Sequence, residues 1–347
     1  MEEWKDILAN CVSDSQSLYR YARIDKKKIE KVIKKYPMRI NPYYLSLIKK
    51  RGDPIWKQCI PDILEIQMQT GRKDPLKEKR YSPMEGVVHR YKDRVLFLIS
   101  DTCAGFCRFC TRKRSVGRRE EVLSQENAAA AFQYVRRHKD VRDVILSGGD
   151  PLTLDDDRIE YYLKNLRQIN HVEIIRIDSR TPCVLPQRIT ARFCAMLKKY
   201  SPIYFNAHFN HYRELTRTSR RAADMLAESG VVLGNQAVLL AGVNDDVSTL
   251  KKLFEGLLTM RIRPYYLYIP DAVRGTYHFR VSIARALKIM RGLIGRTSGL
   301  AIPHLIIDLK HGGGKTPLLP KYIVKRRGRR YVFKNFENKI FYYADIS

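Results

Sequence analysis

The sequence of 347 residues has no long apolar run. No stretch approaches the roughly 20 residues that a membrane-spanning helix needs. The N-terminus, MEEWKDILAN, lacks the basic start and apolar block of a secretory signal. We therefore expect a cytoplasmic protein that does not associate with a membrane.

Acidic residues are also scarce. Asp and Glu number 36 against 65 Lys and Arg, so the formal net charge is +29. Such a charge attracts phosphates, acidic proteins or nucleic acid. The basic runs Lys26–Lys28, Arg112–Arg114 and Lys325–Arg330 lie far apart in the chain, with no single stripe among them. The charge alone therefore indicates a solvated basic surface and selects no partner.

Cysteine is rare, and its number is odd. Seven cysteines in a chain of this length form no disulfide framework. The scattered Cys11, Cys59, Cys183 and Cys194 are expected to be small buried hydrophobic residues. The other three, Cys103, Cys107 and Cys110, lie within the ten residues DTCAGFCRFC.

Short β-branched runs alternate with amphipathic stretches over most of the chain, which predicts parallel strands covered by helices. The apolar runs are residues 94–100, 143–149, 172–178, 202–209, 231–240, 262–269 and 304–309, and the predicted helices are 125–138, 155–168, 188–200 and 214–229. Six β/α units fit an α/β fold with a partial (β/α)6, TIM-like barrel. We expect a helical N-terminal region at 1–80, the barrel at 81–310, and a C-terminal loop with a β-hairpin extension at 311–347.

The cysteine-rich segment follows the first predicted barrel strand, where the loops of such folds carry function. The spacing C-x3-C-x2-C places three thiolates on one loop, one ligand short of a closed metal site. Two readings stay open. The cysteines hold a [4Fe–4S] cluster with one free iron, or His89 or His138 completes a Cys3His zinc site.

This segment resembles the signature of the radical S-adenosylmethionine superfamily, including the aromatic Phe109 before the third cysteine. The resemblance implies that Cys103, Cys107 and Cys110 bind a [4Fe–4S] cluster and that S-adenosylmethionine binds its free iron. The loop SGGDP (147–151) matches the superfamily's glycine-rich element. Gly148 and Gly149 allow close backbone approach, and Asp150 offers an acceptor to the methionyl amino group.

A second motif, HGGGKTP (311–317), contains a lysine in a glycine loop. A phosphate-binding P-loop is excluded, because Leu309 stands where a glycine is needed and Pro317 would interrupt the following helix. Lys315 on such a flexible loop instead suits a Schiff base to an aldehyde cofactor. Arg90 and Arg94 lie four apart on an expected extended segment, with Tyr91 between them, so both guanidinium groups can hold a phosphate.

Taken with these motifs, the chain resembles the lysine 2,3-aminomutase family along nearly its whole length. The similar segments include HRYKDRVLFLISDTC, DVILSGGDPLTL, LGNQAVLLAGVND and GGGKTPLLPKY. The resemblance implies that Lys315 binds pyridoxal 5'-phosphate, with Arg90, Tyr91 and Arg94 around its phosphate. It also implies that His208 and Gln236 contact S-adenosylmethionine.

The same resemblance suggests the substrate. Arg112 matches the residue that binds the substrate carboxylate, and Asp271 and Asp308 match two carboxylates that hold a distal ammonium. The implied reaction is an isomerisation of L-lysine to β-lysine by radical 1,2-amino migration. It needs a low-potential electron donor of the flavodoxin or ferredoxin type, and a homo-oligomer is left open.

Two departures from the family and two rival functions remain. The family commonly has His where this chain has Phe109, and Asp246 stands where some members have a zinc-binding cysteine, so no zinc is expected. One rival is an aminomutase that acts on a protein-bound lysine, as in elongation factor P. The other is a nucleic-acid-binding iron–sulfur protein, which the presence of Lys315 disfavours.

Overall fold

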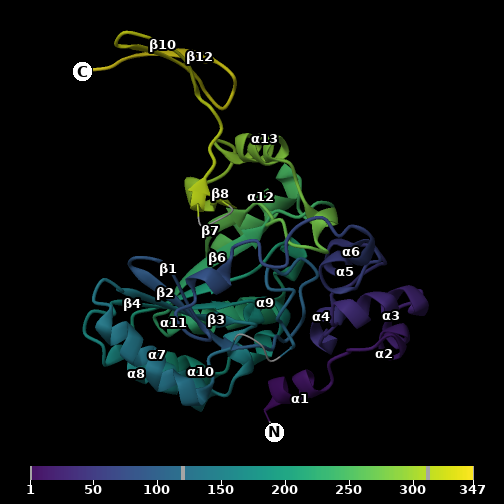
Figure 1. Ribbon diagram of the computed structural model, residues 1–347. Coiled ribbons are helices and arrows are strands. Elements are labelled where there is room, and N and C mark those ends of the chain that lie inside the picture. The colour runs from purple at the N-terminus through teal and green to yellow at the C-terminus, as the bar shows by residue number, and fades with distance from the viewer. Residues whose placement is uncertain (1, 119–121, 310–312, 347) are drawn as a thin grey trace.

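The computed structural model describes residues 2–118, 122–309 and 313–346 (Figure 1). Its centre is a nine-stranded sheet in the sequential order β1 to β9. The seven strands β2 to β8 are parallel, and each pairs with the next strand along the chain. Their bounds are β2 Arg94–Ser100, β3 Asp143–Gly148, β4 Ile174–Ser179, β5 Ile203–Ala207, β6 Val232–Val238, β7 Arg263–Tyr268 and β8 His304–Leu309.

The sheet curls into a half-barrel, as Figure 1 shows. Its two edge strands, β1 (Val87–Tyr91) and β9 (Gly314–Pro317), pair antiparallel with β2 and β8. No ladder joins β1 to β9 in the part of the chain that the structure describes, so the barrel is open. The predicted α/β fold with a partial barrel is confirmed, with β8 as a seventh parallel strand.

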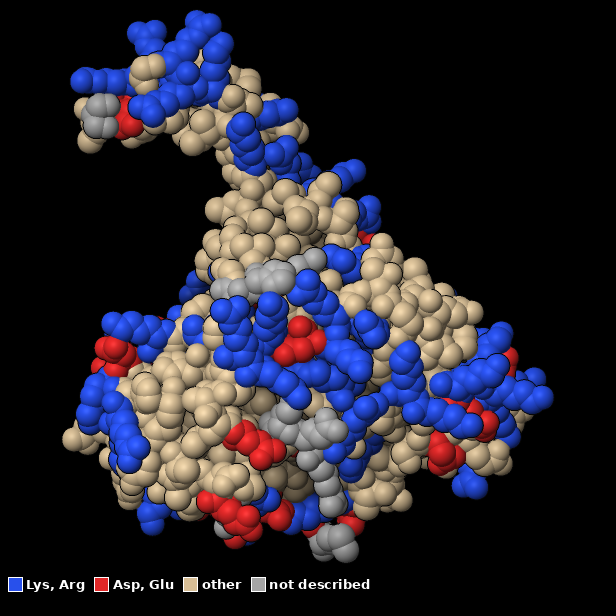
Figure 2. Space-filling model, in the orientation of Figure 1, with Lys and Arg blue, Asp and Glu red and all other residues tan. Residues whose placement is uncertain are grey.

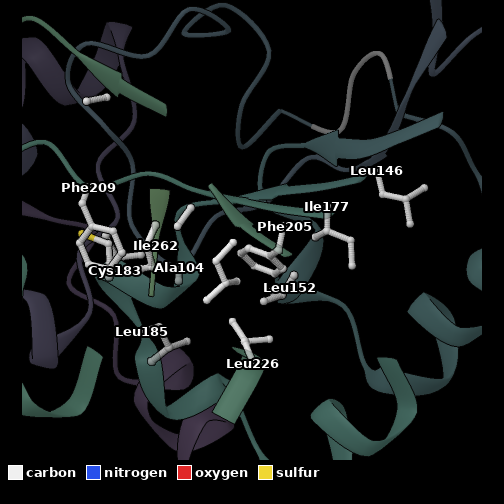
Figure 3. Packing of buried hydrophobic residues seen from close by; sticks show 14 of the residues in the cluster. Ala104, Leu146, Leu152, Ile177, Cys183, Leu185, Phe205, Phe209, Leu226 and Ile262 are labelled. Carbon is white, nitrogen blue, oxygen red and sulfur yellow. The ribbon is translucent and has the colours of Figure 1, made fainter. Parts of the chain in front are cut away.

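Amphipathic helices cover the outer face of the sheet. They are α7 Gln125–Arg137, α8 Asp156–Arg167, α10 Ala191–Lys199, α11 Arg217–Glu228, α12 Val247–Leu258 and α13 Ile283–Leu293. The short helix α9 Thr181–Val184 is buried along its whole length. Side chains from neighbouring strands, such as Ile177 and Phe205, pack with Leu226 of α11 (Figure 3). Ala104, between the first two clustered cysteines, belongs to the same core and is fully buried. The core therefore anchors the cysteine-rich loop.

Residues 2–67 contain six short helices that pack against the body of the protein. They are α1 Glu3–Ala9, α2 Ser15–Tyr21, α3 Lys26–Lys35, α4 Pro42–Ser46, α5 Pro54–Cys59 and α6 Leu64–Gln67. Polar side chains cap several of them: the Asp25 carboxylate accepts from the Lys28 amide, and Asp53 accepts from Trp56. A bridge between Ile40 and Gly105 joins this region to the cysteine-rich loop.

Two local expectations are corrected. Residues 90–94 are not one extended segment, because β1 ends at Tyr91 and β2 begins at Arg94, and these two residues face each other across a tight hairpin. Strand alternation therefore does not place Arg90 and Arg94 on one face. The expected C-terminal hairpin is present as β10 (Ile323–Arg327) and β11 (Arg330–Lys334), but β12 (Ile340–Ala344) adds a third strand.

This three-stranded sheet projects from the body and carries many cations (Figures 1 and 2).

Of the scattered cysteines, Cys59, Cys183 and Cys194 are buried as expected, whereas Cys11 is half-buried. Within the described ranges, every helix is too short or too polar to cross a membrane.

Candidate active site

A cavity of about 330 Å³ opens at the carboxyl ends of the parallel strands. It brings together residues from nearly every β/α loop. Of the predicted site residues it is lined by Cys103, Cys107, Cys110, Arg112, Gly148, Gly149, Asp150, His208, Gln236, Asp271, Asp308 and Lys315. Arg90, Tyr91 and Arg94 lie outside its lining. Arg90 contacts Asp308 of the lining, and the Tyr91 hydroxyl contacts Lys315.

The glycine-rich loop after β3 fastens the start of the cysteine-rich loop. The amide of Gly149 donates to the carbonyl of Ser100 at 2.5 Å, and Asp150 N–H donates to Thr102 at 2.7 Å. Gly148 has φ +127°, and a Cβ there would lie 2.3 Å from the Ser100 carbonyl oxygen. Both glycines are therefore required by protein backbone packing, in addition to the approach to a ligand that the sequence suggested.

The three clustered thiols border the cavity. Burial raises the pKa of Cys103 well above its usual range and that of Cys110 to about 11. The Cys107 sulfur accepts a hydrogen bond from Arg180 Nη1 at 2.7 Å. The described residues contain no three His, Cys, Asp or Glu side chains close enough to hold one metal ion. Thiolates of an iron–sulfur cube bind separate irons, so they stand farther apart than ligands of one ion.

Asp150, His208 and Gln236 lie on the side of the cavity formed by β3 to β6. The Asp150 carboxylate already accepts from Ser179 Oγ at 2.7 Å and from the Arg180 amide at 2.9 Å, so it joins two loops. Burial and the nearby Arg180 charge lower the pKa of His208 to about 3. His208 is therefore a neutral hydrogen-bonding group at physiological pH.

Lys315 lies on the short strand β9 and not on a loop, which corrects the expectation. It stands directly opposite Asp308 of β8, and its amide donates to the Tyr91 hydroxyl at 3.0 Å. Its Nζ lies 6.0 and 5.8 Å from the ring centroids of Tyr266 and Tyr268. Desolvation lowers the pKa of Lys315, opposed by the charges of Asp178 and Asp308, and this increases the fraction of neutral amine although the residue as a whole is exposed. Of the predicted loop, His311 and Gly312 lie outside the described residues.

Arg90 has one carboxylate partner and spare donors. Its Nη1 donates to Asp308 at 3.0 Å, while Nε and Nη2 are buried without a partner. The guanidinium also lies over the Tyr91 ring at 5.5 Å. Arg94 contacts the same ring at 4.7 Å and bonds to Asp93. A buried arginine with two free donors suits an oxyanion such as a phosphate.

The residues assigned to the substrate also have protein partners. Arg112 forms an ion pair with the buried Glu78 at 2.7 Å and donates to the Gly148 carbonyl at 3.3 Å. Asp271 accepts from Thr111 Oγ1 at 3.3 Å. Burial and the charge of Asp308 raise the pKa of Asp271 to about 7. The charge of Asp308 therefore disfavours ionisation of Asp271, and a cation placed between the two carboxylates would favour it.

Sequence reasoning missed four residues that shape the cavity. Glu78 orients Arg112, Asp178 faces Lys315, and Tyr36 forms part of the wall. Arg180 joins Cys107 to the buried Glu214, which it contacts at 3.0 Å. Asp178 is the last residue of the apolar run 172–178 and Arg180 follows two positions later, so their position at the end of a strand was the available signal. Glu78 and Tyr36 lie in the N-terminal region, where no sequence pattern marked them as part of the site.

The chain is similar to known protein families and proteins. Residues 290–346 match a family model described as lysine-2,3-aminomutase, and residues 97–253 match the radical SAM superfamily. An L-lysine 2,3-aminomutase of Fusobacterium nucleatum is 45% identical over 99% of this chain and 83% of its own length. A glutamate 2,3-aminomutase of Clostridioides difficile is 40% identical over 98% and 82%. Among solved structures, anSMEcpe with bound AdoMet has a TM-score of 0.44 at 11% identity, covering 57% of this chain and 56% of the other.

The two family models cover the barrel and the C-terminal region, and the relatives align across almost the whole chain. The aligned relatives are isomerases, so the chain is an enzyme of that class. It belongs to the lysine 2,3-aminomutase family within the radical S-adenosylmethionine superfamily.

Proposed function

We propose that this enzyme interconverts L-lysine and β-lysine by 1,2-amino migration, with pyridoxal 5'-phosphate on Lys315. Membership of the radical S-adenosylmethionine superfamily supports the use of S-adenosylmethionine and a [4Fe–4S] cluster. One observation carries the proposal: a single cavity is lined by three thiols, by Lys315, and by the carboxylates Asp271 and Asp308. The thiols, the amine and the two carboxylates therefore face the same space.

The residues fit the groups assigned to them. Three thiols with no disulfide among them suit iron of a cluster, with Cys103, Cys107 and Cys110 as ligands. The two partnerless nitrogens of Arg90 suit the phosphate of pyridoxal phosphate, and Tyr91 and Arg94 lie beside them. When bound, S-adenosylmethionine and the cluster supply a hydrogen-abstracting radical, and pyridoxal phosphate supplies the group that carries the migrating nitrogen.

The chain's own residues bind and orient. Lys315 offers an amine whose lowered pKa increases its neutral, nucleophilic fraction. Gly148, Gly149, Asp150, His208 and Gln236 line the part of the cavity next to the thiols, where S-adenosylmethionine is proposed to bind.

Substrate selection follows from charge. Asp271 and Asp308 offer two carboxylates to a distal ammonium, and Arg112 offers a guanidinium to the α-carboxylate. A distal carboxylate, as in glutamate, would add a third negative charge next to the two aspartates. Arg90 links the substrate residues to the proposed phosphate site. It contacts Asp308, and its Nε and Nη2 have no partner and can donate to a phosphate.

The test uses protein reconstituted with iron and sulfide without oxygen. Purified enzyme is supplied with S-adenosylmethionine, pyridoxal phosphate, dithionite and either L-lysine, L-glutamate or elongation factor P. Chromatography should show mass-neutral conversion of L-lysine to β-lysine and no conversion of L-glutamate. Turnover of elongation factor P without turnover of free lysine would overturn the substrate assignment. Lys315→Ala should abolish conversion.

A further inference from the structure

Six exposed cations lie on chain segments that meet near Tyr36, next to the cysteine-rich loop. We name these residues the Tyr36 cation ring, and they are Lys34, Lys35, Arg72, Lys73, Arg118 and Arg274. They come from four separate segments of the chain. In the described part of the chain no ion pair with Asp or Glu engages any of them, which leaves their charge open to solvent.

Backbone and side-chain contacts hold these segments together. Arg118 Nη2 donates to the Lys35 carbonyl at 2.7 Å, and Lys35 Nζ donates to Gln69 at 2.5 Å. The amide of Arg274 donates to the Arg72 carbonyl at 2.9 Å. The Tyr36 hydroxyl donates to the Arg274 carbonyl at 3.4 Å. The cations are therefore brought to one surface by built contacts and not by chance exposure.

Tyr36 is the layer between this surface and the cysteines. Its side chain is 8% exposed and lines the same cavity as the three thiols. Arg108, which stands between Cys107 and Cys110 in the sequence, donates to the carbonyl of Tyr36 at 3.3 Å and to that of Pro37 at 2.7 Å. Lys113 Nζ lies 4.7 Å from the Tyr36 ring centroid. A molecule bound over Tyr36 is thus separated from the cysteine-rich loop by one layer of side chains.

The sign of the charge indicates what binds there. L-Lysine and S-adenosylmethionine are both net cations, so a ring of Lys and Arg repels them. A protein with an acidic surface is attracted, and long-range attraction of this kind accelerates encounter. Electron-transfer complexes also need only small interfaces, at the lower end of the range for protein pairs. Because tunnelling weakens steeply with distance, the thin layer at Tyr36 favours electron entry at this place.

We propose that the Tyr36 cation ring is the docking surface for an acidic flavodoxin-type electron carrier that reduces the iron–sulfur cluster. This inference rests on the proposed function, because it requires a cluster on the three cysteines. In the transfer, the anionic flavin hydroquinone loses one electron and becomes the neutral semiquinone. The cluster gains that electron and passes from the 2+ to the 1+ state, and no proton moves.

Other basic surfaces are less suited to this role. The C-terminal sheet β10–β12 is strongly basic but projects away from the body of the protein (Figures 1 and 2). The exposed cations Arg137, Lys139 and Lys164 belong to the region of α7 and α8, on the outer face of the sheet. A carrier bound at either place would be separated from the cysteine-rich loop by more protein than at Tyr36.

The test compares two triple variants with equal charge change. Lys34→Gln, Lys73→Gln and Arg274→Gln are combined in the ring variant, and Arg137→Gln, Lys139→Gln and Lys164→Gln in the control. Surface plasmon resonance measures the binding of flavodoxin to each reconstituted holoenzyme at several salt concentrations. The ring variant should bind about tenfold more weakly, with a shallower salt dependence, and the control should match the unmodified enzyme.

Turnover gives the second readout. The ring variant should need about tenfold more reduced flavodoxin for half-maximal turnover, while its dithionite-driven rate should stay unchanged. Equal binding by both variants, or equal loss in both, would overturn the docking surface. A loss of RNA-oligonucleotide binding by the ring variant, with flavodoxin binding unchanged, would also overturn it. Failure of dithionite to support lysine turnover in the unmodified enzyme would instead reject the proposed function, since flavodoxin binding is measured separately.

Discussion

The affinity for L-lysine should depend on the ionisation of Asp271. Burial and the neighbouring Asp308 raise the pKa of Asp271 to about 7, and only its ionised form attracts the substrate's distal ammonium. Ionisation falls from about 90% one pH unit above this pKa to about 10% one unit below it. The KM for L-lysine should therefore rise roughly tenfold from pH 8 to pH 6. The steepest change is expected near pH 7.

Asp271→Asn removes this ionisation. A hydrogen bond to a charged group contributes about 1.5–3 kcal/mol, so the variant should lose about 10- to 100-fold in kcat/KM at pH 8. Its KM should be nearly independent of pH between 6 and 8. Asp140→Asn, at an exposed ion pair with Lys92, is the matched control and should behave as the unmodified enzyme.

The Asp271→Asn substitution should stabilise the folded protein at pH 8, although it lowers the catalytic efficiency. A carboxyl whose folded pKa exceeds its unfolded value destabilises the fold as pH rises through the interval between the two values. Asp271→Asn should therefore raise the melting temperature of the apoprotein at pH 8 while it weakens lysine turnover. Steady-state kinetics and thermal unfolding measure the two effects. A variant with unchanged KM, or one that keeps the pH dependence, would refute this reasoning.

Three further predictions concern separate parts of the site. Arg90→Gln should weaken pyridoxal phosphate binding about 10-fold or more in an absorbance titration, whereas Arg90→Lys should lose less; equal affinity in all three proteins would contradict the phosphate assignment. Cys107→Ala should lower the amount of iron bound after reconstitution. Cys194→Ala, at a buried thiol outside the cavity lining, should bind as much iron as the unmodified enzyme. Full iron content in Cys107→Ala would count against the cluster. Gly148→Ala should lower the free energy of unfolding by about 2 kcal/mol or more. The added Cβ would lie 2.3 Å from the Ser100 carbonyl oxygen, and the φ of this residue is +127°. An unchanged midpoint in urea unfolding would show that a glycine is not required here.

Local patterns in the sequence predicted the framework of the molecule. Apolar runs separated by amphipathic stretches gave the parallel strands, and β2 begins and ends where the run 94–100 does. The spacing of the cysteines and their position after that strand indicated the functional loop. The strands and the functional loop could be predicted because residues that are neighbours in the sequence mark both of them.

Contacts between distant residues could not be predicted in the same way. Arg90 meets Asp308 across 218 positions of the chain, and Glu78 meets Arg112 across 34. Such pairs depend on how the edge strand and the N-terminal region fold back onto the barrel. The hairpin between β1 and β2 was missed because its turn, Lys92–Asp93, lacks the Asn-Gly or Asp-Gly pair that marks tight turns. The turn before β12 did carry a signal, since Asn338 adopts φ +67°, which Asn tolerates well.

The most direct test of the central claim follows hydrogen through the cavity. The reconstituted enzyme is incubated without oxygen with dithionite, S-adenosylmethionine, pyridoxal phosphate and L-lysine deuterated at its β-carbon. Both recovered S-adenosylmethionine and product are then examined by mass spectrometry. If the thiol-bound cluster and Lys315 serve one cavity, deuterium should appear in the 5'-methylene of S-adenosylmethionine and in β-lysine. Formation of β-lysine with no label in S-adenosylmethionine would contradict the account.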